Sequence, residues 1–287
     1  MLLRAALLLT AFVLSASDFS GARALDEVKK AVSFGPRPAG SAASKRMQAW
    51  ISEELKERGW EVTEDRFNAQ TPGGAVPMTN LVAKRSGLSG RAVVISGHTD
   101  TKKFPFRFVG ANDGGSSTGL LLELARALRE ENLRNDVWLV FLDGEEAVRE
   151  WSDADSLYGS RQLAAKWAAD GSLKHVVALI NVDMIGDRDL QILDESNSTP
   201  ALRQMLRDAA ARLGYSRHIA REPAEIEDDH IPFLREGVPA IDLIDFDYGP
   251  GNSWWHTAAD TPDKLSASSL RVTGSLVIEM LHMLEPH

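Results

Sequence analysis

The feature that most constrains the fold of this chain is an apolar run from Val137 to Leu142 that ends in Asp143-Gly-Glu-Glu. The run is short, continuous and rich in β-branched and aromatic residues, which indicates a buried strand. Open α/β folds build their sites at the carboxyl ends of such strands. Two adjacent carboxylates, Glu145 and Glu146, repel each other unless something positive separates their roles. The pattern therefore predicts a metal held by one glutamate while the other moves protons.

Helical and strand-like patterns alternate along the rest of the chain. The expected elements are helices at 41–59, 115–130, 157–169, 199–213, 229–236 and 265–284, and strands at 60–67, 78–84, 92–96, 175–182 and 239–244. This alternation predicts an α/β fold, a three-layer α/β/α sandwich with a central mixed, mostly parallel sheet. Only the stretch 60–84 carries a hairpin signal.

Length and charge limit the function classes. The chain has 287 residues, enough for one large domain with a sizeable core. Its net charge is −9, and it has no basic block or basic stripe interleaved with aromatic residues, which argues against a nucleic-acid partner. Because the sequence contains no cysteine, neither a disulfide nor lipid attachment at a cysteine can contribute.

The N-terminal residues have the features of a secretion signal. Arg4 supplies positive charge, an apolar stretch runs from Ala5 to Leu14, and Ala22-Arg-Ala24 matches a small-x-small cleavage site. The apolar stretch is too short to span a bilayer as a helix. We therefore expect a signal peptide at 1–24, a single catalytic domain at 25–287 without a membrane span, and export to the periplasm or out of the cell. The alternative is a buried first helix.

Five candidate metal ligands lie at predicted element boundaries. They are His98, Asp113, Glu146, Asp183 and His256. Imidazole and carboxylate together suit Zn²⁺, and three protein ligands plus one open position is the catalytic arrangement. An isolated His is more often structural, and an isolated Asp before a helix is more often an N-cap. Five such residues at the boundaries of one α/β pattern favour a metal site.

Longer motifs give the chain a family resemblance. The supporting stretches are Gly35-Pro-Arg-Pro-Ala-Gly40, Gln70-Thr-Pro-Gly73, Gly97-His-Thr-Asp100, Phe141-Leu-Asp-Gly-Glu-Glu-Ala147, Trp151, Asp155-Ser-Leu-Tyr-Gly-Ser-Arg161, Asp228-Asp-His-Ile-Pro-Phe-Leu234 and Trp255-His-Thr257. On these stretches the chain resembles the M28-like zinc exopeptidase superfamily, and within it most closely the animal-type glutaminyl-peptide cyclotransferases. The stretches that begin at Asp155 and Asp228 are similar to the cyclotransferase branch and distinguish it from the peptidases.

The resemblance implies roles for individual residues. The zinc ligands are expected at Asp113, Glu146 and His256, and the catalytic acid/base at Glu145. The remaining expected site residues are Asp183 and Asp228, which share a hydrogen-bond network with the acid/base, and Trp151, Trp255 and Glu227 at the substrate pocket.

The activity that the resemblance implies is zinc-dependent cyclisation of N-terminal glutaminyl residues of peptides and proteins, which gives pyroglutamate and ammonia. One zinc per chain is expected. The oligomeric state stays open. A receptor-like relative without catalysis is disfavoured because the candidate ligands and the base are all present.

Several residues depart from the cyclotransferase pattern and keep a second activity open. Gly114-Gly-Ser-Ser is similar to the peptidase branch, Asp242 replaces a His and Glu227 replaces a Gln. A second zinc could be held by His98, Asp113 and Asp183, and Glu145 would then activate a water molecule in a two-zinc aminopeptidase. The loop after Asp245 is longer, with Phe246 and Tyr248 as candidates for its pocket aromatic residue.

Overall fold

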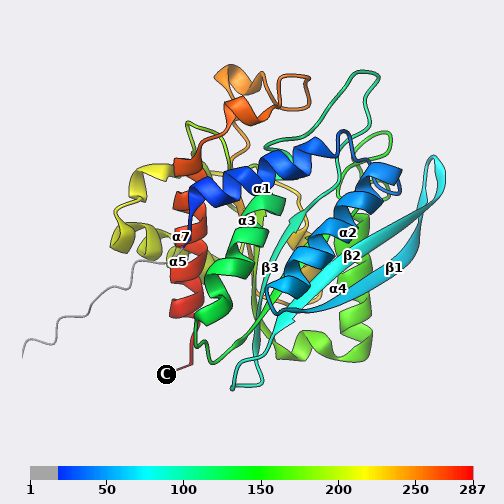
Figure 1. The fold of residues 1–287 in the computed structure, drawn as a ribbon. Coiled ribbons are helices and arrows are strands. Elements are labelled where there is room, and N and C mark those ends of the chain that lie inside the picture. The colour runs from blue at the N-terminus through cyan, green and yellow to red at the C-terminus, as the bar shows by residue number, and fades with distance from the viewer. Residues whose placement is uncertain (1–18, 287) are drawn as a thin grey trace, which may run out of the picture.

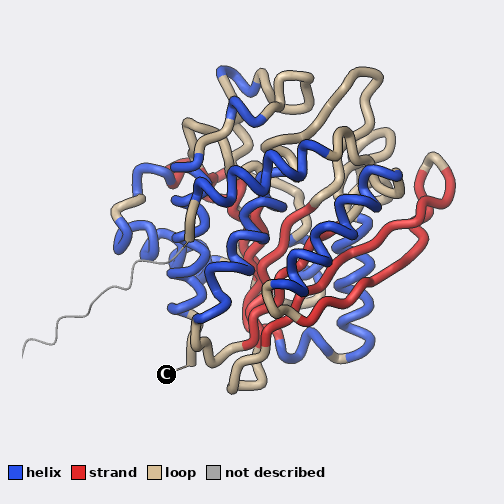
Figure 2. Tube along the Cα trace, in the orientation of Figure 1, coloured by secondary structure: helices blue, strands red, loops and turns tan. Residues whose placement is uncertain are grey.

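A mixed sheet lies at the centre of the computed structural model, which describes residues 19–286 (Figures 1 and 2). The order of its strands is β1-β2-β4-β3-β5-β8. Their bounds are β1 Glu61–Thr71, β2 Gly74–Arg85, β3 Ala92–His98, β4 Asp136–Leu142, β5 Val176–Asp183 and β8 Ala240–Ile244. Strands β4, β3, β5 and β8 pair in parallel, whereas β1 and β2 form an antiparallel hairpin whose second strand pairs antiparallel with β4.

Helices cover both faces of this sheet. One face carries α1 (Gly21–Ser33), α2 (Ala42–Glu57), α3 (Gly115–Ala127), α5 (Pro200–Leu213) and α7 (Ala267–Met283), whose buried side chains form one core cluster with the sheet. The other face carries α4 (Tyr158–Asp170) and α6 (His230–Arg235), which form a second cluster. The arrangement confirms the predicted three-layer α/β/α sandwich.

The central strands show why the apolar runs had to be continuous. In β3, Val93 and Ile95 face the first cluster, whereas Val94 faces the second. Successive side chains of a strand point to opposite faces, so a strand between two helical layers needs apolar residues at every position. In the register of the parallel strands His98 lies opposite Leu142 and Asp183 lies opposite Ile244. The chemistry-bearing residues therefore emerge at one edge.

Helix α2 and the hairpin agree closely with the sequence. The Ser41 hydroxyl accepts a hydrogen bond from the Ser44 amide at 3.0 Å and caps α2, as expected from its position. A second, two-stranded parallel sheet of β6 (Ile192–Glu195) and β7 (Ile219–Ala224) was not predicted. Its strands are short and pairs of charged residues interrupt their apolar ones, so they lack the continuous or alternating apolar pattern that reveals a buried strand.

The expected signal peptide lies mostly within residues 1–18, outside the described part of the chain. Its expected end at Ala24 falls inside α1, which begins at Gly21. Phe19 and Ala24 are buried, and the Phe19 ring packs against Gly274 of α7. Among the described residues, no helix combines the length and apolar character needed to cross a membrane.

Candidate metal and catalytic site

The site lies at the carboxyl edge of the parallel strands. His98 ends β3, Asp183 ends β5, and Glu145 and Glu146 follow β4. Two further residues come from loops: Asp113 lies just before α3, and His256 lies in the loop before α7. They surround a cavity of about 540 Å³ lined by Lys102, Asp113, Glu145, Glu146, Arg149, Glu150, Trp151, Asp183, Met184, Glu225, Ile226, Glu227, Asp228, Ile244, Phe246, Trp255 and His256. All predicted site residues except His98 line this cavity.

Asp113, Glu146 and His256 form a first triad. His256 Nε2 lies 3.2 Å from Asp113 Oδ2 and 3.2 Å from Glu146 Oε1. Zinc bonds of about 2.0–2.1 Å in a tetrahedron place neighbouring ligand atoms roughly 3.3 Å apart. Asp113 Oδ2 is buried and makes no well-directed hydrogen bond, so it is a natural metal ligand. The three side chains therefore match the donor set and spacing of a zinc site.

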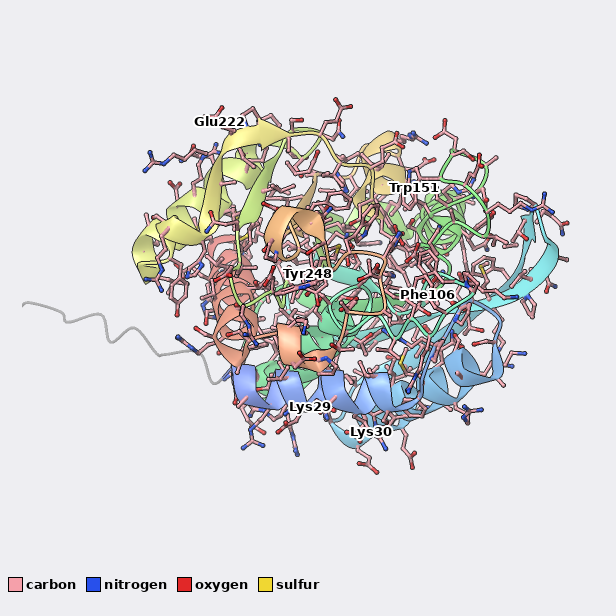
Figure 3. All side chains as sticks on the ribbon, turned by 90° about the horizontal axis from the view of Figure 1, so that it is seen from above. Lys29, Lys30, Phe106, Trp151, Glu222 and Tyr248 are labelled. Carbon is pink, nitrogen blue, oxygen red and sulfur yellow. The ribbon has the colours of Figure 1, made fainter. Side chains whose placement is uncertain are left out.

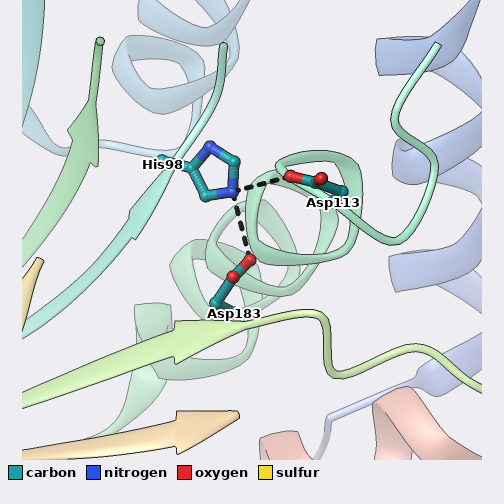
Figure 4. Close-up of side chains that lie close together, drawn as sticks. All are labelled: His98, Asp113 and Asp183. Carbon is teal, nitrogen blue, oxygen red and sulfur yellow. Dashed lines mark hydrogen bonds and ion pairs between the residues drawn. The ribbon is translucent and has the colours of Figure 1, made fainter. Parts of the chain in front are cut away.

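His98, Asp113 and Asp183 form a second triad (Figure 4). His98 Nε2 lies 3.3 Å from Asp113 Oδ1 and 3.1 Å from Asp183 Oδ1. Asp113 therefore offers one oxygen to each triad, and the two triads share it as a bridge. The spacing suits a second metal as well as the first.

A sharp turn separates the two glutamates from β4. Gly144 has φ +75°, and a Cβ there would lie 2.4 Å from Met78 Sδ, so only glycine fits. The buried Asp100 carboxylate then fixes the following backbone. Its Oδ1 accepts hydrogen bonds from the Gly144 and Glu145 amides at 2.9 and 3.1 Å. Its Oδ2 accepts a hydrogen bond from the Glu146 amide at 3.4 Å.

Close contacts within the first triad shift the pKa values of its side chains. Burial alone would raise the pKa of Asp113, but the neighbouring imidazoles of His256 and His98 bring it well below its ordinary value. Burial alone would lower the pKa of His256, but hydrogen bonds to Asp113 and Glu146 raise it to about 9. The triad thus holds a positive charge between two carboxylates, which is the place a metal cation would take.

The pKa values of three other carboxylates in the cavity are raised instead of lowered. Burial, with the neighbouring charge of Glu146, raises the pKa of Glu145 well above its ordinary value against the opposing effect of His98. Burial and the charge of Asp183 raise the pKa of Asp228 to about 6. Burial likewise raises the pKa of Asp183. Clustered carboxylates with raised pKa values are typical of proton-transfer sites.

Aromatic side chains form the cavity walls. Trp255 stacks on the His256 ring at 4.1 Å and packs against Phe246. Trp151 is 42% exposed, and its indole N–H donates to Glu227 at 3.4 Å. Phe246 therefore lines the cavity, whereas Tyr248 is buried outside its lining and donates its hydroxyl hydrogen to Asp260.

Sequence reasoning missed three residues that support the site. Asp100 lies in the Gly97-His-Thr-Asp100 motif, two residues after His98, but the sequence pattern gives it no role. The Lys102 amide donates to Glu146 Oε1 at 3.1 Å, and its ammonium lies 3.7 Å from Glu146 Oε2. Arg37 is fully buried and donates to the carbonyls of residues 99, 109 and 110. An arginine between two prolines was the only sequence signal for this contact.

Comparisons with known proteins agree with this geometry. The model of peptidase family M28 matches residues 80–281. A glutaminyl-peptide cyclotransferase of Drosophila melanogaster is 31% identical, over 78% of this chain and 70% of the relative. The crystal structure of an Acidobacteriales bacterium glutaminyl cyclase has a TM-score of 0.90 at 42% identity, covering 93% of this chain and 95% of the other. A leucine aminopeptidase precursor from Bacteroides thetaiotaomicron shares the fold at a TM-score of 0.84 and 23% identity, covering 94% and 99%.

Proposed function

The chain belongs to peptidase family M28 and, within it, to the glutaminyl-peptide cyclotransferases, and on that basis we propose that it converts N-terminal glutaminyl residues of peptides and proteins to pyroglutamate. The observation that carries the proposal is that one cavity holds a zinc-type triad, the buried carboxylate of Glu145 and a wall of aromatic rings. A small cavity of this kind suits a folded glutaminyl side chain.

Zinc, held by Asp113, Glu146 and His256, would polarise the side-chain amide and stabilise negative charge that develops on its oxygen. We assign one zinc per chain to these residues. The donor set and the 3.2 Å spacings support this assignment.

Glu145 moves the proton in the proposed reaction. The substrate α-nitrogen attacks the side-chain carbonyl carbon, and the new carbon–nitrogen bond closes the ring. Glu145 accepts a proton from that nitrogen and delivers it to the departing side-chain nitrogen, which leaves as ammonia. The raised pKa of Glu145 suits a group that must both accept and release a proton. Asp183 and Asp228 line the same cavity, but Asp183 is hydrogen-bonded to His98 and to the Met184 amide, and Asp228 to the Asp229 amide. Among residues 19–286 no hydrogen bond joins either carboxylate to Glu145, so we assign them an electrostatic effect on the base.

The pocket residues orient the substrate and exclude water. Trp255 and Trp151 provide aromatic walls for the glutaminyl side chain, and Glu227, which accepts the Trp151 indole N–H at 3.4 Å, offers a carboxylate to the substrate amine from the same lining. Because nucleophile and electrophile belong to one residue, holding it folded supplies much of the rate; aligned intramolecular reactions reach effective molarities of roughly 10⁵–10⁸ M.

The second triad supports one rival function, a two-zinc aminopeptidase. Its spacings of 3.1 and 3.3 Å lie close to the 3.2 Å spacings of the first triad. One experiment separates the two functions. Purified, zinc-loaded protein is incubated with Gln-Gly-amide and with Leu-p-nitroanilide, and zinc is counted by elemental analysis. We expect pyroglutamyl product and about one zinc per chain. Release of p-nitroaniline with about two zinc ions per chain would reject the cyclase.

We also propose that the protein is exported to the periplasm or out of the cell and that the folded domain includes Phe19 instead of starting at Leu25. The Ser20 amide donates to Glu123 at 2.8 Å, and Phe19 packs on α7. A chain that starts at Leu25 should be less stable than one that starts at Phe19 by about 3 kcal/mol or more, because a buried Phe and a helix cap are lost. Thermal unfolding of the two chains tests this; equal midpoints would reject the revised boundary.

A further inference from the structure

One of the few large apolar side chains that are exposed lines the cavity, and two others lie on loops that contact site residues. Among the described residues four such side chains are exposed, namely Leu88, Phe106, Val148 and Trp151. Trp151 lines the cavity, and Val148 follows Ala147, whose carbonyl accepts the Lys102 ammonium. Leu88 lies before β3, away from the site, so Phe106, Val148 and Trp151 are the exposed apolar side chains to consider for recognition of a substrate.

Phe106 stands at the end of a chain of aromatic contacts that begins at a predicted zinc ligand. The His256 ring lies 5.3 Å from the Phe104 ring, and Phe104 stacks on Phe106 at 4.8 Å. Phe106 is 42% exposed. An extended peptide advances roughly 3.3–3.6 Å per residue, so the residues just after an N-terminal glutamine can reach this ring. Figure 3 shows Phe106 and Trp151 on the same side of the molecule, seen from above.

The loop that carries Phe106 is held in place. Arg37 donates to the carbonyls of Thr99 and Gly110, both at 2.8 Å, at the two ends of the loop. Phe108 is buried and packs edge-on against His256 and Phe104. An aromatic side chain on a rigid loop binds a partner with little loss of conformational entropy.

The exposed charge of this loop is opposite to that of the protein. Lys103 and Arg107 flank the aromatic residues and are exposed, and no carboxylate of residues 19–286 pairs with either. The whole chain carries a net charge of −9. A surface that is locally positive and aromatic complements a peptide segment that is apolar and negatively charged.

We propose that Lys103, Phe106, Arg107 and Val148 form a ledge that binds substrate residues two to four and favours peptides in which an apolar residue and an acidic residue follow the N-terminal glutamine. This inference rests on the proposed cyclisation and adds its substrate class. The carboxylates of Glu225 and Glu227 also line the cavity and attract the opposite charge, so the sign of the preference is a decisive observable.

The test compares Gln-Phe-Glu-Ala-amide with Gln-Phe-Lys-Ala-amide, with Gln-Gly-amide as a substrate that offers the ledge no side chain. The wild-type protein should favour the Glu peptide by about fivefold in kcat/KM, mainly through KM and less at high salt. Lys103→Glu/Arg107→Glu should reverse the preference. Phe106→Ala should raise KM for both tetrapeptides about threefold and leave Gln-Gly-amide unchanged.

A matched control changes the same charges elsewhere. Lys29→Glu/Lys30→Glu alters two lysines on α1, away from Phe106 in Figure 3, and should keep the wild-type preference. A preference for the Lys peptide, equal turnover of both peptides, or a Phe106→Ala variant that changes only self-association would overturn the ledge.

Binding of both tetrapeptides to zinc-loaded Glu145→Gln protein, measured by calorimetry, tests the ledge independently of turnover. Failure to cyclise Gln-Gly-amide would reject the proposed function. Equal calorimetric affinities would reject the ledge alone.

Discussion

The two triads share Asp113 and have nearly the same spacing, yet they differ in access. The His256 side chain is 21% exposed and lines the cavity, whereas the His98 side chain is 1% exposed and does not. His98 Nδ1 instead lies 3.8 Å from Glu145 Oε2. Spacing alone therefore predicts two equivalent metal sites, while access separates one that opens to the cavity from one that is enclosed beside Glu145.

The largest effect is expected at the accessible triad. His256→Ala removes the only imidazole of this triad, so zinc content should fall close to zero. Activity on Gln-Gly-amide should fall by about 10³-fold or more, since metal stabilisation of the transition state contributes several kcal/mol. Elemental analysis and product quantification measure both. A variant that keeps zinc and turnover would show that the first triad is not the catalytic metal site.

A smaller but still large effect is expected at the base. Glu145→Gln preserves size and hydrogen bonding but cannot accept the proton, so cyclisation should fall by about 10²–10⁴-fold while zinc content stays at the wild-type value. Single-turnover product formation and elemental analysis separate the two properties. Near-normal turnover in this variant contradicts the role given to Glu145.

The smallest effect is expected at the enclosed triad. His98→Gln should keep about one zinc per chain and lower cyclisation by about tenfold, as changes beside a catalytic group commonly do. Zinc counting and the same product assay apply. If zinc instead falls from about two per chain to one and hydrolysis of Leu-p-nitroanilide is lost, the two triads work as a pair and the enzyme is a peptidase.

The layers of the fold could be predicted because the central strands are apolar at every position and the helices at 41–59 and 265–284 carry strong patterns. The small sheet of β6 and β7 could not, because its strands are short and charged residues interrupt their apolar ones. Helix α1 was obscured by the secretion-type segment before it. A pattern with small residues around Ala24 suits both a cleavage site and close packing of α1 against Gly119 of α3.

The candidate ligands could be predicted because each follows an element that sequence patterns reveal. The supporting contacts could not. Asp100 binds amides that lie 44–46 residues further along the chain, and Arg37 binds carbonyls 62–73 residues away. A side chain that hydrogen-bonds to main-chain groups does not require a particular residue type in the segment it binds. The sequence of that segment therefore gives no sign of the contact.

Asp100 accepts hydrogen bonds from three successive amides, so the main chain of Glu145 and Glu146 moves as one rigid unit. A shift of the metal ligand is transmitted to the base, and a shift of the base is transmitted to the ligand. The relative position of the two main-chain segments is thus set by Asp100, while contacts with Lys102 and His256 place the Glu146 carboxylate itself. Improving one of them by substitution in its surroundings will displace the other, which makes this pair a poor place to tune either role separately.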